Sequence, residues 1–268
     1  MTRTRTRQSH LAGLREVWRH RELLRSLTAR NLRVKYKRSA LGFLWTLLNP
    51  LLMLSILAVV FSTIVKIQVP HYLAFLLSGY FAWNFMLQTM SVGTYVLAEH
   101  ANLNRSVAYP KEIPILAALA SRMVEYLIEL TLVLAALLPF HHHGLPPAVL
   151  LLPWLMAVQI LLSLGFVFPI AVLSVFYHDV QHALPIVLTA LFYISPVFYP
   201  ASMVPGSVQK IYLMNPVAQL LTAYHTVLYD GRVPSIALIC VLTGVSVLLC
   251  WSGYGIFNRY KHLIPEIL

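Results

Sequence analysis

The sequence predicts an all-α integral membrane protein, and three observations support this fold class. Of its 268 residues, 59% are hydrophobic and only 11% are charged, whereas a typical soluble domain has about 25% charged residues. The apolar residues are grouped in runs of about 20, the length of helix that crosses the hydrocarbon core of a bilayer. The net charge of +11 is concentrated before the first of these runs. Together these features exclude a soluble domain.

We expect two regions: residues 1–40 form a basic cytoplasmic tail and an interface helix, and residues 41–268 form one transmembrane domain. Within residues 10–30, leucines recur at helical spacing with arginines between them. This pattern is typical of an amphipathic helix in the membrane interface, although an ordinary surface helix fits it as well. The basic block has no groove-reading motif, so we expect no nucleic acid as a partner. It is instead typical of a cytoplasmic N-terminus that attracts anionic membrane lipid.

The pattern of apolar runs predicts six transmembrane helices, the fifth of which is short. Their expected ranges are 41–65, 72–97, 114–138, 148–175, 183–198 and 235–257. Asn49-Pro50 interrupts the first run and predicts a kink there. Residues 199–233 mix proline and glycine with apolar and aromatic residues, which predicts short re-entrant or interfacial helices on the outer side, before the last span.

The distribution of basic residues predicts the orientation of these helices. Seventeen of the 20 Lys and Arg residues fall in segments assigned to one side, and only Lys66, Lys210 and Arg232 fall on the other. Cytoplasmic segments of membrane proteins carry such an excess. Because the number of spans is even, we expect both termini in the cytoplasm and a multi-pass protein of the inner (plasma) membrane.

Motifs for nucleotide and metal chemistry are absent from the sequence. There is no glycine-rich phosphate loop ending in Lys-Ser or Lys-Thr, so the chain cannot hydrolyse ATP by that route. There is also no Gly-x-Ser-x-Gly elbow and no His-Glu-x-x-His motif. The triplet His141–His143 has no fourth ligand at a suitable spacing, and we therefore expect no metal site.

Three charged residues inside the third apolar run form a candidate polar helix face. Arg122, Glu125 and Glu129 are spaced i, i+3 and i+7, which places them on one side of a helix. Since a charge inside the hydrocarbon is costly, these side chains should face protein or water. They form either a polar lining or subunit contact, or an Arg122–Glu125 ion pair that only fixes the helix end.

Aromatic residues form a second candidate site. Seven of them are expected to line a pore: Phe81, Trp83, Phe85, Phe192, Tyr193, Phe198 and Tyr199. Part of this pattern also fits an aromatic belt at the membrane interface. The alternative is a track along which sugar rings slide, since aromatic rings pack against the apolar faces of sugars.

Four segments in order resemble the permease subunits of ABC-2 type exporters of polysaccharides such as O-antigen and teichoic acid. These segments are RELLRSLTARNLRVKYKRSALGFLWTLLNPLL at 21–52, ANLNRSVAYPKEIPILA at 101–117, FYHDVQHALPIVL at 176–188, and the proline-rich stretch at 195–231. The chain departs from the family pattern at His178, where arginine is common.

The resemblance implies that two copies form a pore and that a separate nucleotide-binding subunit holds ATP and Mg²⁺, with no cofactor on this chain. It also implies that a polyprenyl-linked glycan is carried outward, and that this chain is not an enzyme. The residues implied for coupling to the ATPase are Tyr109, Pro110, Lys111, Glu112, His178 and Asp179. Those implied to meet the lipid diphosphate are Arg33, Lys35, Lys37 and Arg38.

Two other functions fit the sequence. One is an ABC-2 exporter of another lipid or of drugs. The other is a membrane-embedded enzyme of polyprenyl-linked glycan metabolism, which would need polar catalytic residues gathered at one membrane depth.

Overall fold

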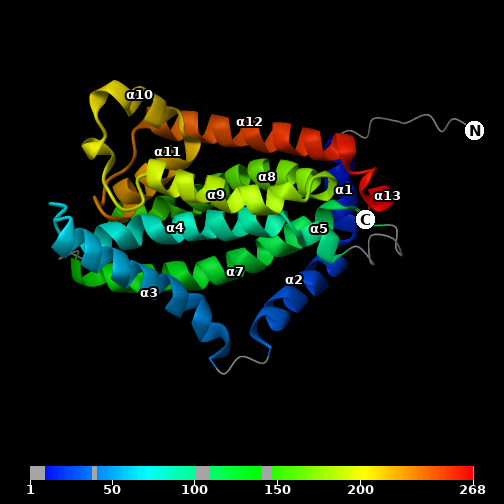
Figure 1. Cartoon of the computed structure of the whole chain (residues 1–268), viewed down its shortest axis with the longest axis horizontal. Helices are drawn as coiled ribbons and strands as arrows, with labels where there is room; N and C mark the ends of the chain where they lie inside the picture. The colour runs from blue at the N-terminus through cyan, green and yellow to red at the C-terminus, as the bar shows by residue number, and fades with distance from the viewer. Residues whose placement is uncertain (1–9, 38–40, 101–108, 141–145, 268) are drawn as a thin grey trace, which may run out of the picture.

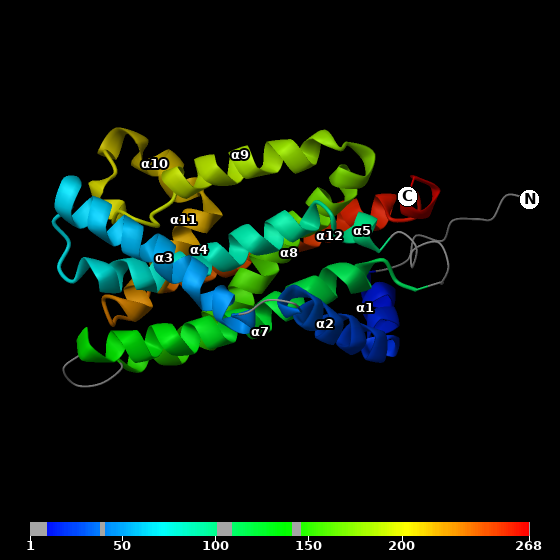
Figure 2. The same cartoon turned by 60° about the horizontal axis from the view of Figure 1, so that its bottom comes forward.

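The computed structural model describes residues 10–37, 41–100, 109–140 and 146–267, and in these residues it is helical with no β-strand (Figure 1). The longer helices lie side by side along one axis in both views (Figures 1 and 2), which confirms the predicted all-α class. The principal helices are α1 (His10–Arg19), α2 (Arg21–Tyr36), α3 (Trp45–Val59), α4 (Tyr72–Gly93), α5 (Val96–Glu99), α7 (Glu112–Leu137), α8 (Leu152–Phe176), α9 (Asp179–Ile194), α10 (Gly206–Met214), α11 (Pro216–Leu228), α12 (Ile236–Tyr260) and α13 (Ile264–Ile267).

Four helical segments of the described chain are long and apolar enough to cross a bilayer. They are Trp45–Ile64, Glu112–Phe140, Pro147–Phe176 and Ile236–Tyr260, and they correspond to the first, third, fourth and sixth predicted spans. The second predicted span is α4, whose 22 residues include Asn84 and Gln88 and are therefore less apolar. The fifth is α9, which has only 16 residues.

Local sequence signals set several helix ends. Asn215 and Ser235 cap α11 and α12, because their side chains accept hydrogen bonds from the backbone N–H groups of Val217 and Leu238 at 3.0 and 3.3 Å. The first span stays helical through Pro50, which lies inside α3. α9 starts at Asp179, four residues before the start predicted for the fifth span.

Helix α4 is the centre of the bundle, and its residues from Ala74 to Met86 are all buried. The short helix α11 packs against it at one point of close approach. There the His225 ring stacks on Phe75 with 4.1 Å between ring centres, and one nitrogen lies 2.7 Å from the Ser78 hydroxyl. Gly79 makes this approach possible, because a Cβ at this position would lie 2.6 Å from the His225 ring. Two short helices, α10 and α11, therefore precede the last span, and α11 is tightly packed against α4.

Helices α8 and α12 approach each other closely. At their crossing, Gly165 faces Gly253, and a Cβ on Gly253 would lie 2.3 Å from the Gly165 carbonyl oxygen. Backbones can approach this closely only where side chains are absent, as in other membrane helix pairs. The two helices therefore form one tightly joined pair.

The ends of the bundle differ in what they carry. Helices α1, α5 and α13 lie at one end together with the beginnings of α7 and α9, whereas α10 lies at the other end (Figures 1 and 2). The first and last described helices are thus at the same end. We call this the α1/α13 end.

The glycine contact gives a direct test of the bundle. Replacing Gly253 with alanine should lower the free energy of unfolding by about 1–3 kcal/mol, because the added methyl group meets backbone that cannot move aside. A methyl group added to Gly255, on the same helix, would meet no described atom of a neighbouring segment within 4 Å. Gly255→Ala is therefore the matched control and should leave stability nearly unchanged. Thermal unfolding of the detergent-solubilised protein measures both, and equal midpoints for the two variants would contradict the close contact.

Candidate functional site

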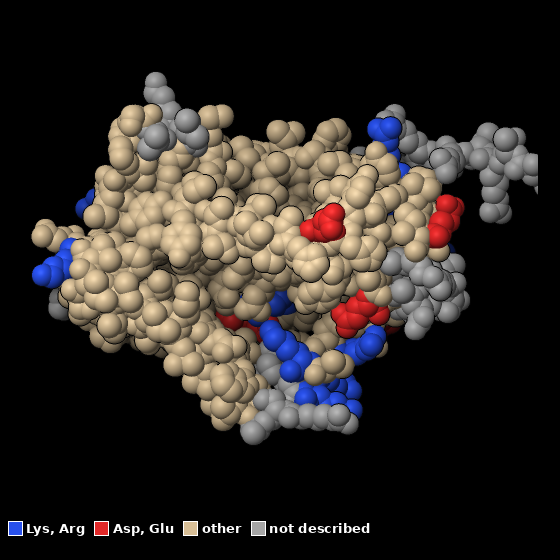
Figure 3. Space-filling model, viewed as in Figure 1, with Lys and Arg blue, Asp and Glu red and all other residues tan. Residues whose placement is uncertain are grey.

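Helix α2 is held on the bundle by its apolar stripe. Leu27 is buried in a small cluster with Tyr109, Ile113 and Ala117, and Leu23 and Leu24 pack against the same cluster. The leucines that predicted an amphipathic helix thus cover the beginning of α7. The opposite side of α2 is left for its basic residues, and Figure 3 shows charged side chains gathered around α2 and toward the α1/α13 end.

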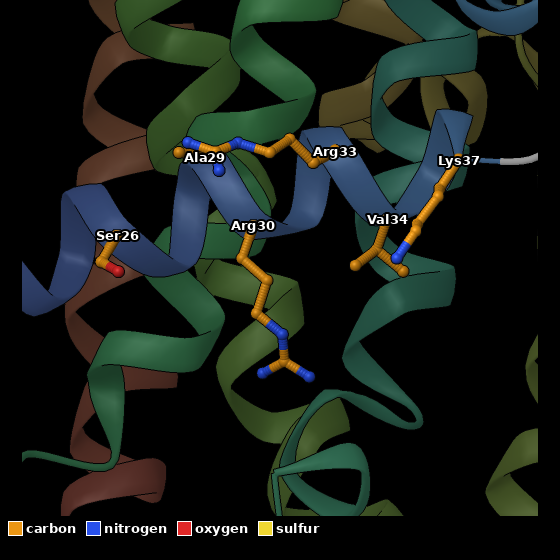
Figure 4. Close-up of a pocket in the computed structure, with 6 residues that line it drawn as sticks. All are labelled: Ser26, Ala29, Arg30, Arg33, Val34 and Lys37. Carbon is orange, nitrogen blue, oxygen red and sulfur yellow. The ribbon is translucent and has the colours of Figure 1, made fainter.

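The exposed side of α2 carries a cationic groove with a volume of about 590 Å³. The described residues that line it are Ser26, Ala29, Arg30, Arg33, Val34 and Lys37. Figure 4 shows Arg30, Val34 and Lys37 projecting from the same side of the helix, with Arg33 lying along it toward Ala29. Their spacing of three, four and seven residues explains this, because such residues share a helix face. The groove presents three positive charges and no described acid.

Of the residues predicted to meet the lipid diphosphate, Arg33 and Lys37 line this groove, whereas Lys35 does not. Neighbours two apart on a helix point about 200° apart, so Lys35 faces away from Arg33 and Lys37. Its Nζ lies 2.8 and 2.9 Å from the two carboxylate oxygens of Glu125 on α7. Arg38 lies outside the described residues.

Glu125 is the centre of a buried charge network. Its other partner is Arg122, which donates to Oε2 of Glu125, and Nη2 of Arg122 lies 3.7 Å from Oε1 of Glu129. The side chains of Glu125 and Glu129 are only 2% and 0% exposed. The structure thus brings together the predicted face of Arg122, Glu125 and Glu129 and includes the predicted Arg122–Glu125 pair. With Lys35 it holds two positive and two negative charges.

Glu112 forms a second buried ion pair, this time with the C-terminal segment. Its Oε1 accepts from Nζ of Lys261 at 2.7 Å and from the Tyr254 hydroxyl at 3.1 Å. Glu112 is buried, so it joins the beginning of α7 to the end of α12 and offers no surface to another subunit in this conformation.

The other residues predicted for coupling differ in exposure. Tyr109 and Pro110 are buried, and burial raises the pKa of the Tyr109 hydroxyl to about 12. Nζ of Lys111 lies 4.5 Å from the centre of the Tyr109 ring, and partial burial lowers the Lys111 pKa. His178 and Asp179 are exposed at the start of α9. A direct contact with a partner therefore remains possible only for Lys111, His178 and Asp179. Residues 101–108 of the same loop lie outside the described part of the chain.

The aromatic residues divide into two groups. Phe198 packs against Phe192, Tyr193 and Tyr199 with ring centres 5.0–5.7 Å apart, and Phe192 also meets Trp83. Phe61 on the first span stacks on Phe198 at 4.6 Å and extends this aromatic cluster. Phe81 and Phe85 lie elsewhere, against Tyr80 and Tyr126.

Burial decides which of these rings can face a pore. Phe81, Trp83 and Phe85 are buried inside the subunit, so in this conformation they cannot line a pore between two copies. Tyr193 is 60% exposed, and Phe192 and Tyr199 are half-buried. The accessible side of the aromatic cluster therefore belongs to α9 and the segment after it.

Two features of the site were not anticipated from the sequence. One is the partnership of Lys35 with Glu125, and the other is a buried chain in which Tyr224 donates to Gln159 at 2.5 Å and Gln159 donates to the Ala82 carbonyl at 3.0 Å. No group of three potential metal ligands occurs among the described residues, and the histidines at 141–143 lie outside them.

Comparison with known proteins gives consistent matches over most of the chain. The profile of the ABC-2 type transporter family matches residues 22–229. The chain is 29% identical to the O-antigen export system permease protein RfbA of Myxococcus xanthus, over 94% of this chain and 98% of that protein. It is 25% identical to the protein of the same name from Klebsiella pneumoniae, over 92% and 95% of the two chains. It is also 24% identical to the polysialic acid transport protein KpsM of Escherichia coli, over 78% and 81%.

Two glutamates with the same local pairing test the buried network. Glu125 pairs with an arginine three residues away and is buried, whereas Glu22 pairs with Arg25 three residues away and is 74% exposed. Glu125→Gln should destabilise the protein by about 3–5 kcal/mol, because it removes the carboxylate that pairs with the buried guanidinium group of Arg122. Glu22→Gln should cost less than about 1 kcal/mol. Thermal unfolding of the two variants measures both losses of stability. If the two variants lose similar stability, the buried network contributes no more than a surface ion pair.

Proposed function

Because this chain belongs to the ABC-2 type transporter family, we propose that it is the membrane-spanning subunit of an ATP-driven exporter of a lipid-linked polysaccharide. The observation that carries this proposal is the cationic groove of α2 in a chain that aligns almost end to end with O-antigen export permeases. One arginine guanidinium group can donate two parallel hydrogen bonds to a phosphate group. A polyprenyl diphosphate would supply the phosphate oxygens at the membrane surface. The sugar chain attached to it is the cargo.

The proposed arrangement has six crossings of the inner membrane, with α4 and α9 as the second and fifth. α4 is long enough for a crossing, and of its less apolar residues Asn84 is buried and Gln88 is partly buried. The α1/α13 end is the cytoplasmic end, supported by the basic residues of α2 and the tail and by the excess of cations in cytoplasmic segments. The hairpin of α10 and α11 then enters the bundle from the outer side.

ATP hydrolysis is assigned to a separate subunit, since the sequence lacks a phosphate loop. That subunit would dock at the α1/α13 end on Lys111, His178 and Asp179. Two copies of the chain would form the pore, and the accessible aromatic residues of α9 would face the passing sugars. Tyr193 supports this role by its exposure.

The docking assignment has a test with a control at the opposite end of the molecule. The chain is co-expressed with the nucleotide-binding subunit of its operon, the complex is purified in lipid nanodiscs, and ATP hydrolysis is measured. Lys111→Ala combined with His178→Ala should lower hydrolysis or complex yield several-fold, because it removes accessible contacts. Lys66→Ala, outside every proposed contact, should leave both unchanged. Failure of a well-folded chain to co-purify with the ATPase would contradict the exporter function and favour a membrane-embedded enzyme.

Phosphate recognition by the groove can be tested within one helix. Arg30→Gln with Arg33→Gln should weaken binding of a polyprenyl diphosphate by about tenfold or more, because two charge-assisted hydrogen-bonding groups are lost. Arg21→Gln with Arg25→Gln removes the same charge from α2 outside the groove and should have a much smaller effect. Equilibrium binding of the polyprenyl diphosphate to the complex in nanodiscs, at low and at high salt, measures the effect of each double variant. Equal losses for the two pairs would show that only general charge attraction acts.

A further inference from the structure

A second hollow, which we call the inner recess, lies on the other side of the end of α2. Its described lining consists of Lys35, Gly42, Trp45, Thr46, Asn49, Pro50 and Gln88, from the end of α2, the turn before α3, the beginning of α3 and the last part of α4. Its volume is about 150 Å³. Figure 3 shows the molecule hollowed between α2 and α3, with charged side chains at the bottom of the hollow.

The charge of the inner recess differs from that of the cationic groove. Lys35 is the only charged residue among its described lining residues, and its ammonium group lies on the carboxylate of Glu125. The network behind it is balanced, with Lys35 and Arg122 against Glu125 and Glu129. An anion would therefore gain little here, whereas the groove has three cations and no described acid. The recess favours an uncharged ligand.

The remaining side chains of the recess match a ligand rich in hydroxyl groups. Asn49 is exposed, and its amide can both donate and accept. Nε2 of Gln88 donates to the Asn84 side chain at 3.1 Å, which leaves the Gln88 amide oxygen as an acceptor for a hydroxyl. Trp45 is 43% exposed, so its indole face is available to the apolar face of a sugar ring. A few fixed polar groups beside an aromatic surface are typical of small-molecule sites.

We propose that the inner recess binds one sugar ring of the substrate, with Asn49 and Gln88 bonding its hydroxyls and Trp45 packing against its face. The small volume suits a single ring, since pockets for drug-sized ligands occupy about 300–1,000 Å³. This inference rests on the proposed function and deepens it. It assigns the sugar to the recess and the diphosphate to the groove.

The two subsites meet at the end of α2, on opposite sides of the helix. Lys35 borders the recess, and Lys37, the residue that caps the helix, borders the groove two residues further along the chain. In a lipid-linked glycan the diphosphate is bonded directly to the first sugar. The end of α2 therefore separates a phosphate subsite from a sugar subsite, and the adjoining sugar would be the one nearest the lipid.

The test compares two probes on the purified complex in nanodiscs: a polyprenyl diphosphate, and the same lipid carrying one hexose. In the wild type the hexose should tighten equilibrium binding by about tenfold, the size expected for two or three neutral hydrogen bonds. Asn49→Leu and Gln88→Leu should each remove most of that gain and leave binding of the bare diphosphate unchanged. Gln209→Leu, the same change on exposed α10, is the control and should keep the gain.

The outcomes separate the two proposals. If both probes bind the wild type equally, or if the leucine variants keep the gain, the sugar subsite is wrong while the exporter function stands. If neither probe binds a well-folded complex, the proposed function fails and the subsite fails with it. Because Gln88→Leu replaces an amide by an apolar side chain of similar size inside the bundle, loss of the gain would not reflect unfolding when bare diphosphate still binds.

Discussion

Burial of three carboxylates along α7 is the constraint on which the α1/α13 end depends. Glu112, Glu125 and Glu129 are all nearly inaccessible, and a buried charge without a partner costs several kcal/mol. Each is compensated by a cation: Lys261 at Glu112, and Lys35 and Arg122 at the other two. Lys35 lies near the beginning of the chain and Lys261 near its end. The carboxylates of α7 therefore determine where α2 and the end of α12 lie.

The beginning of α7 consequently connects α2 to the end of α12. Tyr109 packs against Leu27 of α2, and three residues later Glu112 binds Tyr254 and Lys261 of the C-terminal segment. Any displacement of this short segment must move α2, α12 or both. In the proposed exporter, this links the surface that meets the ATPase to α2, the helix that carries the phosphate subsite and borders the sugar subsite. α12 in turn is joined to α8 at the glycine contact.

Local properties of the sequence predicted much of the fold, because length, hydropathy and helical spacing are local. The runs at 114–138, 148–175 and 235–257 correspond to observed helices, and the i, i+3, i+7 spacing placed Arg122, Glu125 and Glu129 together. Contacts between distant segments were not predictable in this way. Lys35 and Glu125 are 90 residues apart, and nothing near either residue identifies the other.

Some errors had a signal that sequence reasoning could have used. Helical spacing separates Lys35 from Arg33 and Lys37 by more than half a turn, so the basic cluster should have been divided between two faces. Asp179 is a favourable residue in the first turn of a helix, which agrees with the earlier start of α9. The burial of Phe81, Trp83 and Phe85 had no such signal, because α4 is apolar on all sides and only packing decides what covers it.

The pairing of Lys261 with Glu112 has a consequence for how the topology of this protein is mapped. A common approach fuses a reporter enzyme after successive truncation points and reads which side each junction occupies. A junction placed after Phe257 would remove Lys261 while keeping the whole apolar part of α12. Glu112 would then lack its cation, and the first turn of α7 would be free to shift. Reporters inserted into the intact chain avoid this artefact, because Lys261 stays at the end of α12 and keeps its ion pair with Glu112 of α7.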